Sequence, residues 1–397
     1  MTEVQVIDLF SGCGGMSCGF MLAETKNVRF KLLGGLDVDP HANRTYARML
    51  GRPALGLSAL DLIRKNSAAM VEALDTWGYQ AELPLVLIGC APCQGFSSHR
   101  KKDPRKDERN DLITCFAKIA AKLQPDIVLM ENVPELLHSK HWKHFSEFKR
   151  ILEAEGYKVR AQIHNAAEYG VPQERFRALV VASKAAHLTH MPLPTHRPGT
   201  YRTVRDAIGH LPPLEAGQQD KNDTMHITSK HRPETVRLLQ AIPQDGGSRS
   251  ALPDHMVKDC HRAVDGFRDV YGRLWWDKPA VSITARCRTP SCGRFTHPEQ
   301  HRGLTVREAA QLQSFPSDWI FDGPFDDKYK QIGNAVAPAF AKAIAETIDS
   351  SWISDRAPSG AELEKDVRRA ITRSISSSLG AWKRRSLPGD FALELSA

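Results

Sequence analysis

The chain has 397 residues, of which 41% are hydrophobic and 25% are charged, as is ordinary for a globular protein of about two domains. A net charge of +8 and a pI of about 9.0 favour an anionic partner, nucleic acid above all, although a merely basic globular protein has the same charge. No apolar run approaches the ~20 residues that span a bilayer, and no secretory leader precedes the first strand, so we expect a cytoplasmic protein without a membrane partner whose eight cysteines are reduced.

The first third of the chain alternates apolar strands with helical patterns. Strands are predicted at 4–10, 30–37, 84–88 and 127–131, and helices at 114–123 and 142–156. This alternation predicts a Rossmann-like α/β fold, with a mostly parallel sheet and helices on both of its faces. Ligands of such sheets collect at the carboxyl ends of the strands.

A glycine-rich segment at 8–16 follows the first strand and opens a helix. Its glycines allow a tight turn and close backbone approach to a ligand, but their spacing is not that of a dinucleotide motif. A purely structural turn is the alternative. Phe10 is suited to stack on an adenine, and Asp37, ending the second strand, to accept hydrogen bonds from ribose hydroxyls. The arrangement suits a nucleoside cofactor without a pyrophosphate.

Cys93 lies on the loop that leaves the third strand, between Pro92 and a glutamine. Reactive groups of α/β enzymes occur on such loops, so Cys93 is the candidate nucleophile. An inert buried thiol is the commoner role of a lone cysteine. The spacing from Cys90 also matches a redox pair or half of a zinc site. No second pair has zinc-like spacing, so we expect no metal, and Cys90 is interpreted as a packing residue.

Glu131 and Asn132 end the fourth strand, beside the strand that leads to Cys93. Both groups are therefore expected to reach one cleft, although a strand-end glutamate is often a helix cap or salt-bridge partner. Arg175 and Arg177 precede the apolar strand 178–181. Residues two apart on a strand face the same way, so the two arginines are predicted to orient a carboxylate together. Surface charge on an edge strand is the alternative.

The character of the chain changes near residue 183, because 187–300 is rich in Pro, His, Arg and Gly. Helical patterns return at 305–313, where Thr305 and Glu308 fit a capping box, and at 339–348. These patterns predict a discontinuous first domain (1–182 and 301–350), a loop-rich second domain (183–300) and a C-terminal basic extension (351–397) of unassigned role.

Together, the motifs resemble those of the DNA (cytosine-5)-methyltransferases, in family order and over roughly residues 4–345. The matching segments are DLFSG-x-GG (8–15), PCQGFS (92–97), ENV (131–133), Q-x-R-x-R (173–177), REAA-x-LQSFP (307–316) and GNAV (333–336).

The resemblance implies the methyltransferase fold and S-adenosylmethionine as methyl donor, with S-adenosylhomocysteine as product. The cofactor residues that it implies are Asp8, Phe10, Ser11, Gly12, Gly14, Gly15, Asp37, Asp61, Pro92 and Asn334. Asp37 stands where many relatives carry glutamate. Asp61, assigned to the adenine, has a local match of only three residues.

The resemblance also implies the catalytic roles. Cys93 would attack C6 of cytosine, which makes C5 nucleophilic. Glu131 would hold or protonate N3, and Arg177 would anchor O2 and Glu131. Asn132 would help order the site, and Arg175 is also counted among the catalytic residues. The base that removes the C5 proton is left open, a water or a side chain.

Because the target atom is buried in the duplex, the cytosine must flip out. The basic segment 98–110 would close over the DNA as a lid, with a solvated loop as the alternative. The second domain would recognise the target sequence. The residues expected to contact DNA are Ser97, Arg109, Arg286, Arg288 and Arg294, although many such arginines contact only phosphate.

We therefore expect a monomeric bacterial-type enzyme that methylates C5 of cytosine in one duplex DNA sequence, in restriction-modification or phage defence. A cognate restriction endonuclease or proteins of a defence system would be its partners. Three alternatives remain: the same chemistry on RNA, a catalytically silent DNA-binding relative, and a thiol oxidoreductase that uses Cys90 and Cys93.

Overall fold

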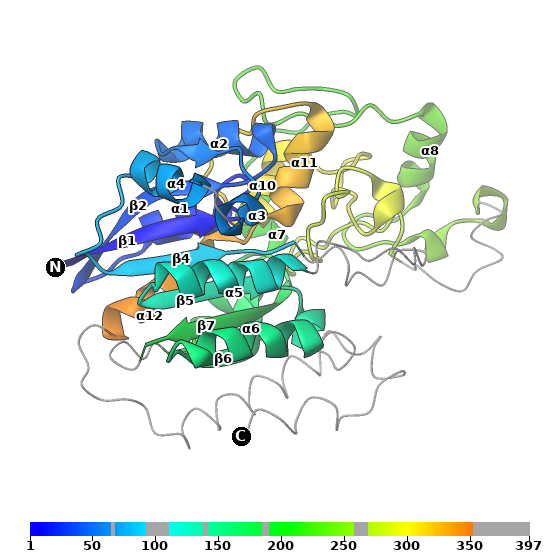
Figure 1. Cartoon of the computed structure of the whole chain (residues 1–397). Helices are drawn as coiled ribbons and strands as arrows, with labels where there is room; N and C mark the ends of the chain where they lie inside the picture. The colour runs from blue at the N-terminus through cyan, green and yellow to red at the C-terminus, as the bar shows by residue number, and fades with distance from the viewer. Residues whose placement is uncertain (65–67, 93–110, 138–141, 185–189, 258–268, 352–397) are drawn as a thin grey trace. The chain divides into compact units, whose positions relative to one another are not determined.

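The computed structural model describes residues 1–64, 68–92, 111–137, 142–184, 190–257 and 269–351. In this part of the chain, seven strands form one sheet in the order β3-β2-β1-β4-β5-β7-β6 (Figure 1). They are β1 (Thr2–Leu9), β2 (Val28–Leu36), β3 (Ala54–Leu55), β4 (Leu85–Gly89), β5 (Ile127–Asn132), β6 (Lys158–Asn165) and β7 (Phe176–Ser183). Only β7 runs against its neighbours. The predicted α/β fold with a mostly parallel sheet is confirmed.

Two strands were not predicted from the sequence, and both lie at edges of the sheet. Strand β3 has only two residues, and β6 mixes polar with apolar residues. The four long predicted strands are β1, β2, β4 and β5, with shifts of one or two residues at their ends. Buried central strands give long apolar runs, whereas edge strands do not.

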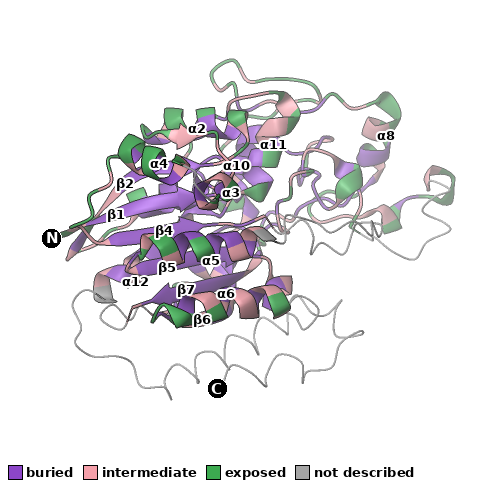
Figure 2. Cartoon of the chain, in the orientation of Figure 1, coloured by how far each residue is buried: buried purple, intermediate pink, exposed green. Residues whose placement is uncertain are grey.

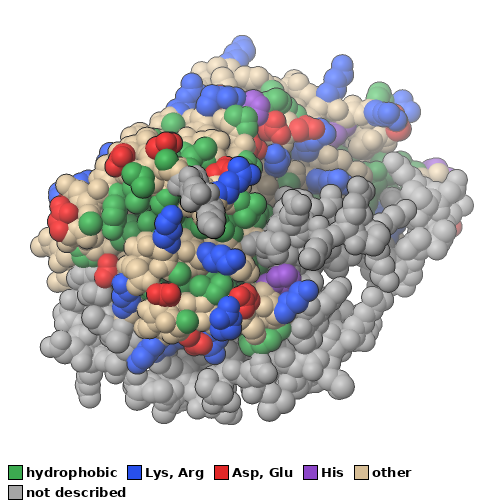
Figure 3. Space-filling model, viewed as in Figure 1, with side chains coloured by type: hydrophobic (Ala, Val, Ile, Leu, Met, Phe, Trp, Pro, Cys, Tyr) green, Lys and Arg blue, Asp and Glu red, His purple; other side chains and the backbone are tan. Residues whose placement is uncertain are grey.

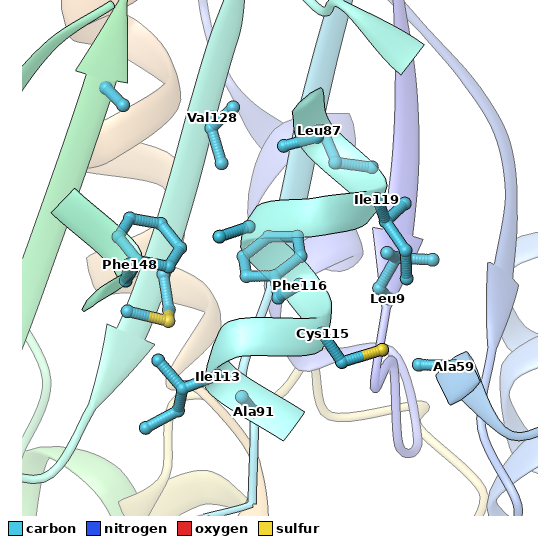
Figure 4. Packing of buried hydrophobic residues seen from close by; sticks show 14 of the residues in the cluster. Leu9, Ala59, Leu87, Ala91, Ile113, Cys115, Phe116, Ile119, Val128 and Phe148 are labelled. Carbon is cyan, nitrogen blue, oxygen red and sulfur yellow. The ribbon is translucent and has the colours of Figure 1, made fainter. Parts of the chain in front are cut away.

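Helices cover both faces of the sheet. One face carries α3 (Ala59–Ile63), α4 (Ala69–Trp77), α5 (Asp111–Leu123) and α6 (Trp142–Ala154). Figure 4 shows Phe116 and Ile119 of α5 directed at Leu9, Leu87 and Val128 of three neighbouring strands. Figure 2 shows the consequence, since the strands are buried while the outer sides of these helices are exposed.

The other face of the sheet carries α1 (Gly15–Leu22), α2 (Pro40–Leu50) and the last described helix, α12 (Pro338–Ser351). Ser17 of α1 is hydrogen-bonded to Asp8, and Phe340 of α12 contacts the ring of His164 on β6. Side chains alternate between faces along a strand, so Asp8 and His164 point away from the core that α5 and α6 build.

The chain divides into two compact units. Unit 1 holds 1–165, 176–193 and the described residues from 340 onward, and unit 2 holds 166–175 and 194–339. The segment 301–339, expected to rejoin the first domain, thus groups with unit 2. The Gln173 amide and the Arg175 guanidinium explain this grouping, because they donate to the carbonyls of Leu312 (2.8 Å) and Gly333 (3.0 Å).

Unit 2 is built of short helices and loops. The helices in its described residues are α7 (Val204–Ile208), α8 (Pro233–Ala241), α10 (Val306–Leu312) and α11 (Phe325–Asn334). Short 3-10 helices are Pro134–Leu137 in unit 1 and Ala166–Tyr169, Arg249–Ala251, Asp254–Met256 and Pro290–Cys292 in unit 2. The predicted capping box that begins α10 is confirmed, with Thr305 and Glu308 bonding each other's backbone N–H. Within the described ranges, no helix is both long and apolar enough to cross a bilayer.

Candidate active site

The turn after β1 has an unusual backbone. Phe10, Gly12 and Gly14 all have positive φ angles (56°, 51° and 88°), a conformation that costs energy for a residue other than glycine. The turn leads the chain from β1 straight into α1. A Cβ added at Gly12 would meet no heavy atom within 4 Å, so the backbone there borders open space in which a ligand can approach.

Asp37 closes this turn from the end of β2. Its Oδ2 accepts the Gly12 N–H (2.9 Å), and its Oδ1 accepts the Asp39 N–H (2.9 Å). Burial raises the pKa of Asp37, although these hydrogen bonds oppose the rise. The side chain is only half-buried, and each carboxylate oxygen has a second lone pair. Asp37 can therefore accept further hydrogen bonds from a ligand.

Val38, beside Asp37, is a further exposed residue at this strand end that was not predicted from the sequence. Its side chain is 70% exposed, which is unusual for an apolar residue directly after a buried strand. Its place between the two acids Asp37 and Asp39 was the available signal. An exposed apolar side chain here can pack on the flat face of a ligand whose hydroxyls bind Asp37.

Asp8 lies beneath the turn rather than at its surface. Its carboxyl is buried and accepts the Ser17 hydroxyl (2.6 Å), which in turn contacts the Tyr46 hydroxyl (3.0 Å). Burial raises the pKa of Asp8 to about 7. The expectation that Asp8 contacts the cofactor is corrected accordingly: its carboxyl joins α1 to β1, and it supports the turn from below.

Ser11 and Asp61, two further expected cofactor residues, differ in their free hydrogen-bonding capacity. The buried hydroxyl of Ser11 has no hydrogen-bond partner within the described part of the chain. Asp61 caps α3 by accepting the Ser58 N–H (3.0 Å) and pairs with Arg64 (3.2 Å). Ser11 therefore has an unmet hydrogen bond, whereas each Asp61 oxygen has one partner. Gly15 is buried where α1 begins, and Pro92 is half-buried after β4.

Glu131 and Arg177 lie together at the end of β5. The Arg177 Nε is 3.0 Å from Glu131 Oε1, and the Glu131 side chain is only 4% exposed. Their proximity follows from the sheet, because Glu131 lies opposite Leu179 in the antiparallel pairing of β5 with β7. Arg177, two residues before Leu179, therefore points to the same face as Glu131.

The second oxygen of Glu131 has a partner that was not expected. The thiol of Cys90 donates to Glu131 Oε2 at 3.0 Å. Cys90 is half-buried, and the interpretation of it as a packing residue is wrong. Asn132 lies next to this contact, and its amide donates to the Ala91 carbonyl at 3.1 Å. Asn132 thereby ties the start of the loop after β4 to the end of β5.

Arg175 does not share its partners with Arg177. Strand β7 begins at Phe176, so Arg175 precedes the strand and the two-residue alternation does not apply to it. Its guanidinium donates to the carbonyls of Ile283 (2.8 Å), Gly333 (3.0 Å) and Ala335 (3.2 Å) within unit 2. The prediction that both arginines orient one carboxylate is therefore wrong. Arg175 instead holds the backbone on both sides of the exposed Asn334.

Arg294, one of the expected DNA-contacting residues, is internal to unit 2. Its guanidinium stacks on Trp275 at 4.1 Å and donates to the Arg273 carbonyl (2.8 Å) and to Asp269 (2.9 Å). A buried arginine with these contacts cannot reach a base without breaking them. Arg294 is therefore corrected to a residue that stabilises the loops of unit 2.

The other two arginines remain accessible. Arg288 forms an exposed ion pair with Asp326 (3.0 Å), and Arg286 is exposed. Figure 3 shows basic side chains spread over this face of the molecule with acidic ones among them. Cys93, Ser97, Arg109 and the basic segment 98–110 lie outside the described residues.

The family model of the C-5 cytosine-specific DNA methylases matches residues 4–350. Type II methylase M.HgiDII of Herpetosiphon aurantiacus is 36% identical over 350 residues, which cover 86% of this chain and 94% of the relative. Type II methyltransferase M1.HphI of Haemophilus parahaemolyticus is 35% identical over 354 residues, 87% of either chain.

Solved structures agree on the fold. A prophage-encoded DNA modification methyltransferase from E. coli superposes with a TM-score of 0.67 at 22% identity, over 88% of this chain and 100% of that one. The Dnmt2 methyltransferase of S. pombe superposes with a TM-score of 0.58 at 16% identity, over 88% of this chain and 99% of that one. The family predicted from the motifs is confirmed: the chain belongs to the C-5 cytosine-specific DNA methylases and is a methyltransferase enzyme.

Proposed function

We propose that this enzyme transfers a methyl group from S-adenosylmethionine to C5 of a flipped-out cytosine in one duplex DNA sequence, through a covalent bond between Cys93 and C6. The observation that carries the proposal is the buried Glu131 carboxylate, with Arg177 on one oxygen and Cys90 on the other. A buried charge is costly unless it is paired and hydrogen-bonded. Such a carboxylate at the end of β5 suits proton exchange with a ring nitrogen.

The turn after β1 supports S-adenosylmethionine as the methyl donor. The unpartnered Ser11 hydroxyl, the open space at Gly12 and the half-buried Asp37 carboxylate fit a ligand with hydroxyl and amino groups and no phosphate. Asp37 would hold the ribose hydroxyls, Val38 and Phe10 would pack on the adenine, and Ser11 would bind a polar group of the amino-acid part. When bound, this cofactor supplies the electrophilic methyl group.

Cys93 would act as the nucleophile. Its sulfur electron pair would form a bond to C6, while the electron pair of the C5–C6 double bond shifts onto C5 and toward N3, which makes C5 nucleophilic. After C5 has gained the methyl group, a base removes the C5 proton. The electron pair of that bond restores the C5–C6 double bond, and Cys93 leaves as a thiolate. The net change would replace one hydrogen on C5 by the methyl group of S-adenosylmethionine, leaving S-adenosylhomocysteine and one released proton.

Glu131 would control the charge on the ring during addition. A proton shared between its carboxyl and N3 neutralises the ring as Cys93 adds, and returns to Glu131 on elimination. Arg177 holds Glu131 Oε1, and its guanidinium would also donate to the cytosine O2. Asn132 would keep the loop that leads to Cys93 against β5 through its bond to Ala91.

The proposed setting is a type II modification system, in which methylation protects one DNA sequence from an endonuclease of the same specificity. Support comes from the relatives, which are named type II methylases and methyltransferases. Unit 2 would read the sequence, with the accessible Arg286 and Arg288 as the remaining candidates for contacts with guanine or phosphate.

The test is incubation of the full chain with labelled S-adenosylmethionine and either duplex DNA of mixed sequence or RNA. Label should enter DNA and should be absent with Cys93→Ala. The matched control is Cys115→Ala, since Cys115 is a buried core cysteine of α5 directed at Ala59 (Figure 4) and its loss should leave methylation intact. Label in RNA alone, or equal label with Cys93→Ala, would refute the proposal. Bisulfite sequencing of the product should show methylation in one sequence context.

A further inference from the structure

We propose that Cys90 is a positioning residue for Glu131: its thiol holds the second carboxylate oxygen and fixes the orientation in which Glu131 meets the base. This inference rests on the proposed role of Glu131 in methyl transfer. It assigns a function to Cys90, the first cysteine of the C-x-x-C pair. A redox, zinc or packing role for Cys90 does not explain its hydrogen bond to Glu131.

The two oxygens of Glu131 are held by different kinds of donor. Arg177 Nε lies 3.0 Å from Oε1, and Cys90 Sγ lies 3.0 Å from Oε2. Arg177 also donates to its own neighbour, the Phe176 carbonyl, at 2.6 Å, which restrains the guanidinium. The last torsion of a glutamate side chain is broad, so a single partner would leave the carboxyl plane free to turn. The second partner removes that freedom.

The backbone around Cys90 is itself tightly placed. Gly89 pairs with Met130 in the parallel register of β4 and β5, and a Cβ added at Gly89 would lie 2.7 Å from the Leu9 carbonyl oxygen. On the other side of Cys90, the Ala91 carbonyl accepts the Asn132 amide. The contact between Cys90 and Glu131 is therefore set by the sheet on one side and by Asn132 on the other.

A thiol suits this position because it donates without adding charge. A lysine or arginine at Cys90 would add a second cation beside Glu131, whose carboxylate already pairs with Arg177. A thiol is a weak and neutral donor, so it orients the carboxylate without forming a second ion pair. Serine keeps a neutral donor on a shorter side chain, and alanine removes the donor.

The first test is a double-mutant cycle on single-turnover methylation with Cys90→Ala, Glu131→Ala and the double variant. Cys90→Ala alone should lower the rate about tenfold, which corresponds to ~1.4 kcal/mol, while the Kd for S-adenosylmethionine changes less than twofold. Cys90→Ser should recover most of the rate. In the Glu131→Ala background, Cys90→Ala should have no further effect. Cys115→Ala, the control, should lower stability and leave the rate unchanged.

Equal rate losses from Cys90→Ala in both backgrounds would show a merely structural role and overturn the inference, as would an unchanged rate in Cys90→Ala. The second test needs no activity. The infrared S–H stretch of Cys90, identified by difference from Cys90→Ala, should shift in Glu131→Ala because its acceptor is gone. An unshifted band would refute the contact even if the protein methylates DNA. If the band shifts in Glu131→Ala but the unmodified chain labels no DNA, the contact between Cys90 and Glu131 stands and the proposed function is rejected.

Discussion

Removal of Glu308 tests how much unit 2 depends on one buried ion pair. Glu308 and Arg302 are 1% and 0% exposed, and two hydrogen bonds of 2.8 Å join them. Glu308 also accepts the Thr305 N–H at 2.8 Å and completes the capping box of α10. Glu308→Ala would leave the Arg302 guanidinium buried without its carboxylate and would open the first turn of the helix.

Two magnitudes set the expected loss. Breaking a buried pair by removing one partner costs about 3–5 kcal/mol, and the lost capping interaction adds about 1 kcal/mol. Burial alone would raise the pKa of Glu308, but Arg302, His297 and the Thr305 N–H together outweigh burial and lower it to about 2, from an ordinary value of 4.5. That difference corresponds to roughly 3 kcal/mol. Because the folded pKa is depressed, this stability is complete above pH 4.5 and is lost as the pH falls toward 2.

The assay is urea unfolding of the full chain and of Glu308→Ala at pH 7 and at lower pH. We expect a loss of about 4–6 kcal/mol at pH 7 that shrinks below pH 4.5. The matched control is Asp277→Ala, which breaks an equally bidentate pair with Arg205 (2.7 and 3.1 Å) whose side chains are 72% and 53% exposed. Its loss should be far smaller than that of Glu308→Ala, because water screens an exposed pair. Similar losses in both variants would refute the argument from burial.

Three further predictions concern unit 1. Asp349 of α12 accepts the backbone N–H groups of Lys26 (3.0 Å), Asn27 (2.7 Å) and Val28 (3.2 Å). Asp349→Ala should therefore lower the free energy of unfolding, measured in urea, by about 2 kcal/mol. A loss below about 0.5 kcal/mol would contradict this prediction. Burial lowers the pKa of His164 to about 3, below its ordinary 6.5, so the unfolded chain binds the extra proton and stability falls as the pH drops from 6.5 toward 3. His164→Leu should flatten the dependence of the unfolding midpoint on pH in that window. An unchanged dependence would argue against His164 as its source. Asp37→Asn should weaken S-adenosylmethionine binding, measured by calorimetry, about tenfold, while the free energy of unfolding changes by less than about 1 kcal/mol. An unchanged affinity would show that Asp37 does not bind the cofactor.

Much of the fold and part of the site follow from local sequence. The apolar runs of β1, β4, β5 and the second half of β2 identify the central sheet because these residues are buried on both faces. The capping box of α10 depends on residues three apart, and so it is visible without a fold. The turn after β1 and the acid after β2 are likewise local patterns at strand ends, where open α/β sheets bind ligands.

Tertiary structure decided which side chains meet. Arg175 and Arg177 look equivalent in the sequence, but β7 begins between them, so one enters unit 2 and the other pairs with Glu131. Arg294 looks like a residue for DNA contact, and only the packing of Trp275 and Asp269 around it shows that it is internal.

The sequence by itself therefore determined the family, the sheet and the residue types at the strand ends, because these depend on short-range patterns. It did not determine that the Cys90 thiol donates a hydrogen bond to Glu131, 41 residues away. That contact depends on the parallel register of β4 with β5 and on the hydrogen bond from the Asn132 amide to the Ala91 carbonyl. Long-range pairs of this kind are set by strand register and strand ends, which residue spacing along the chain does not specify.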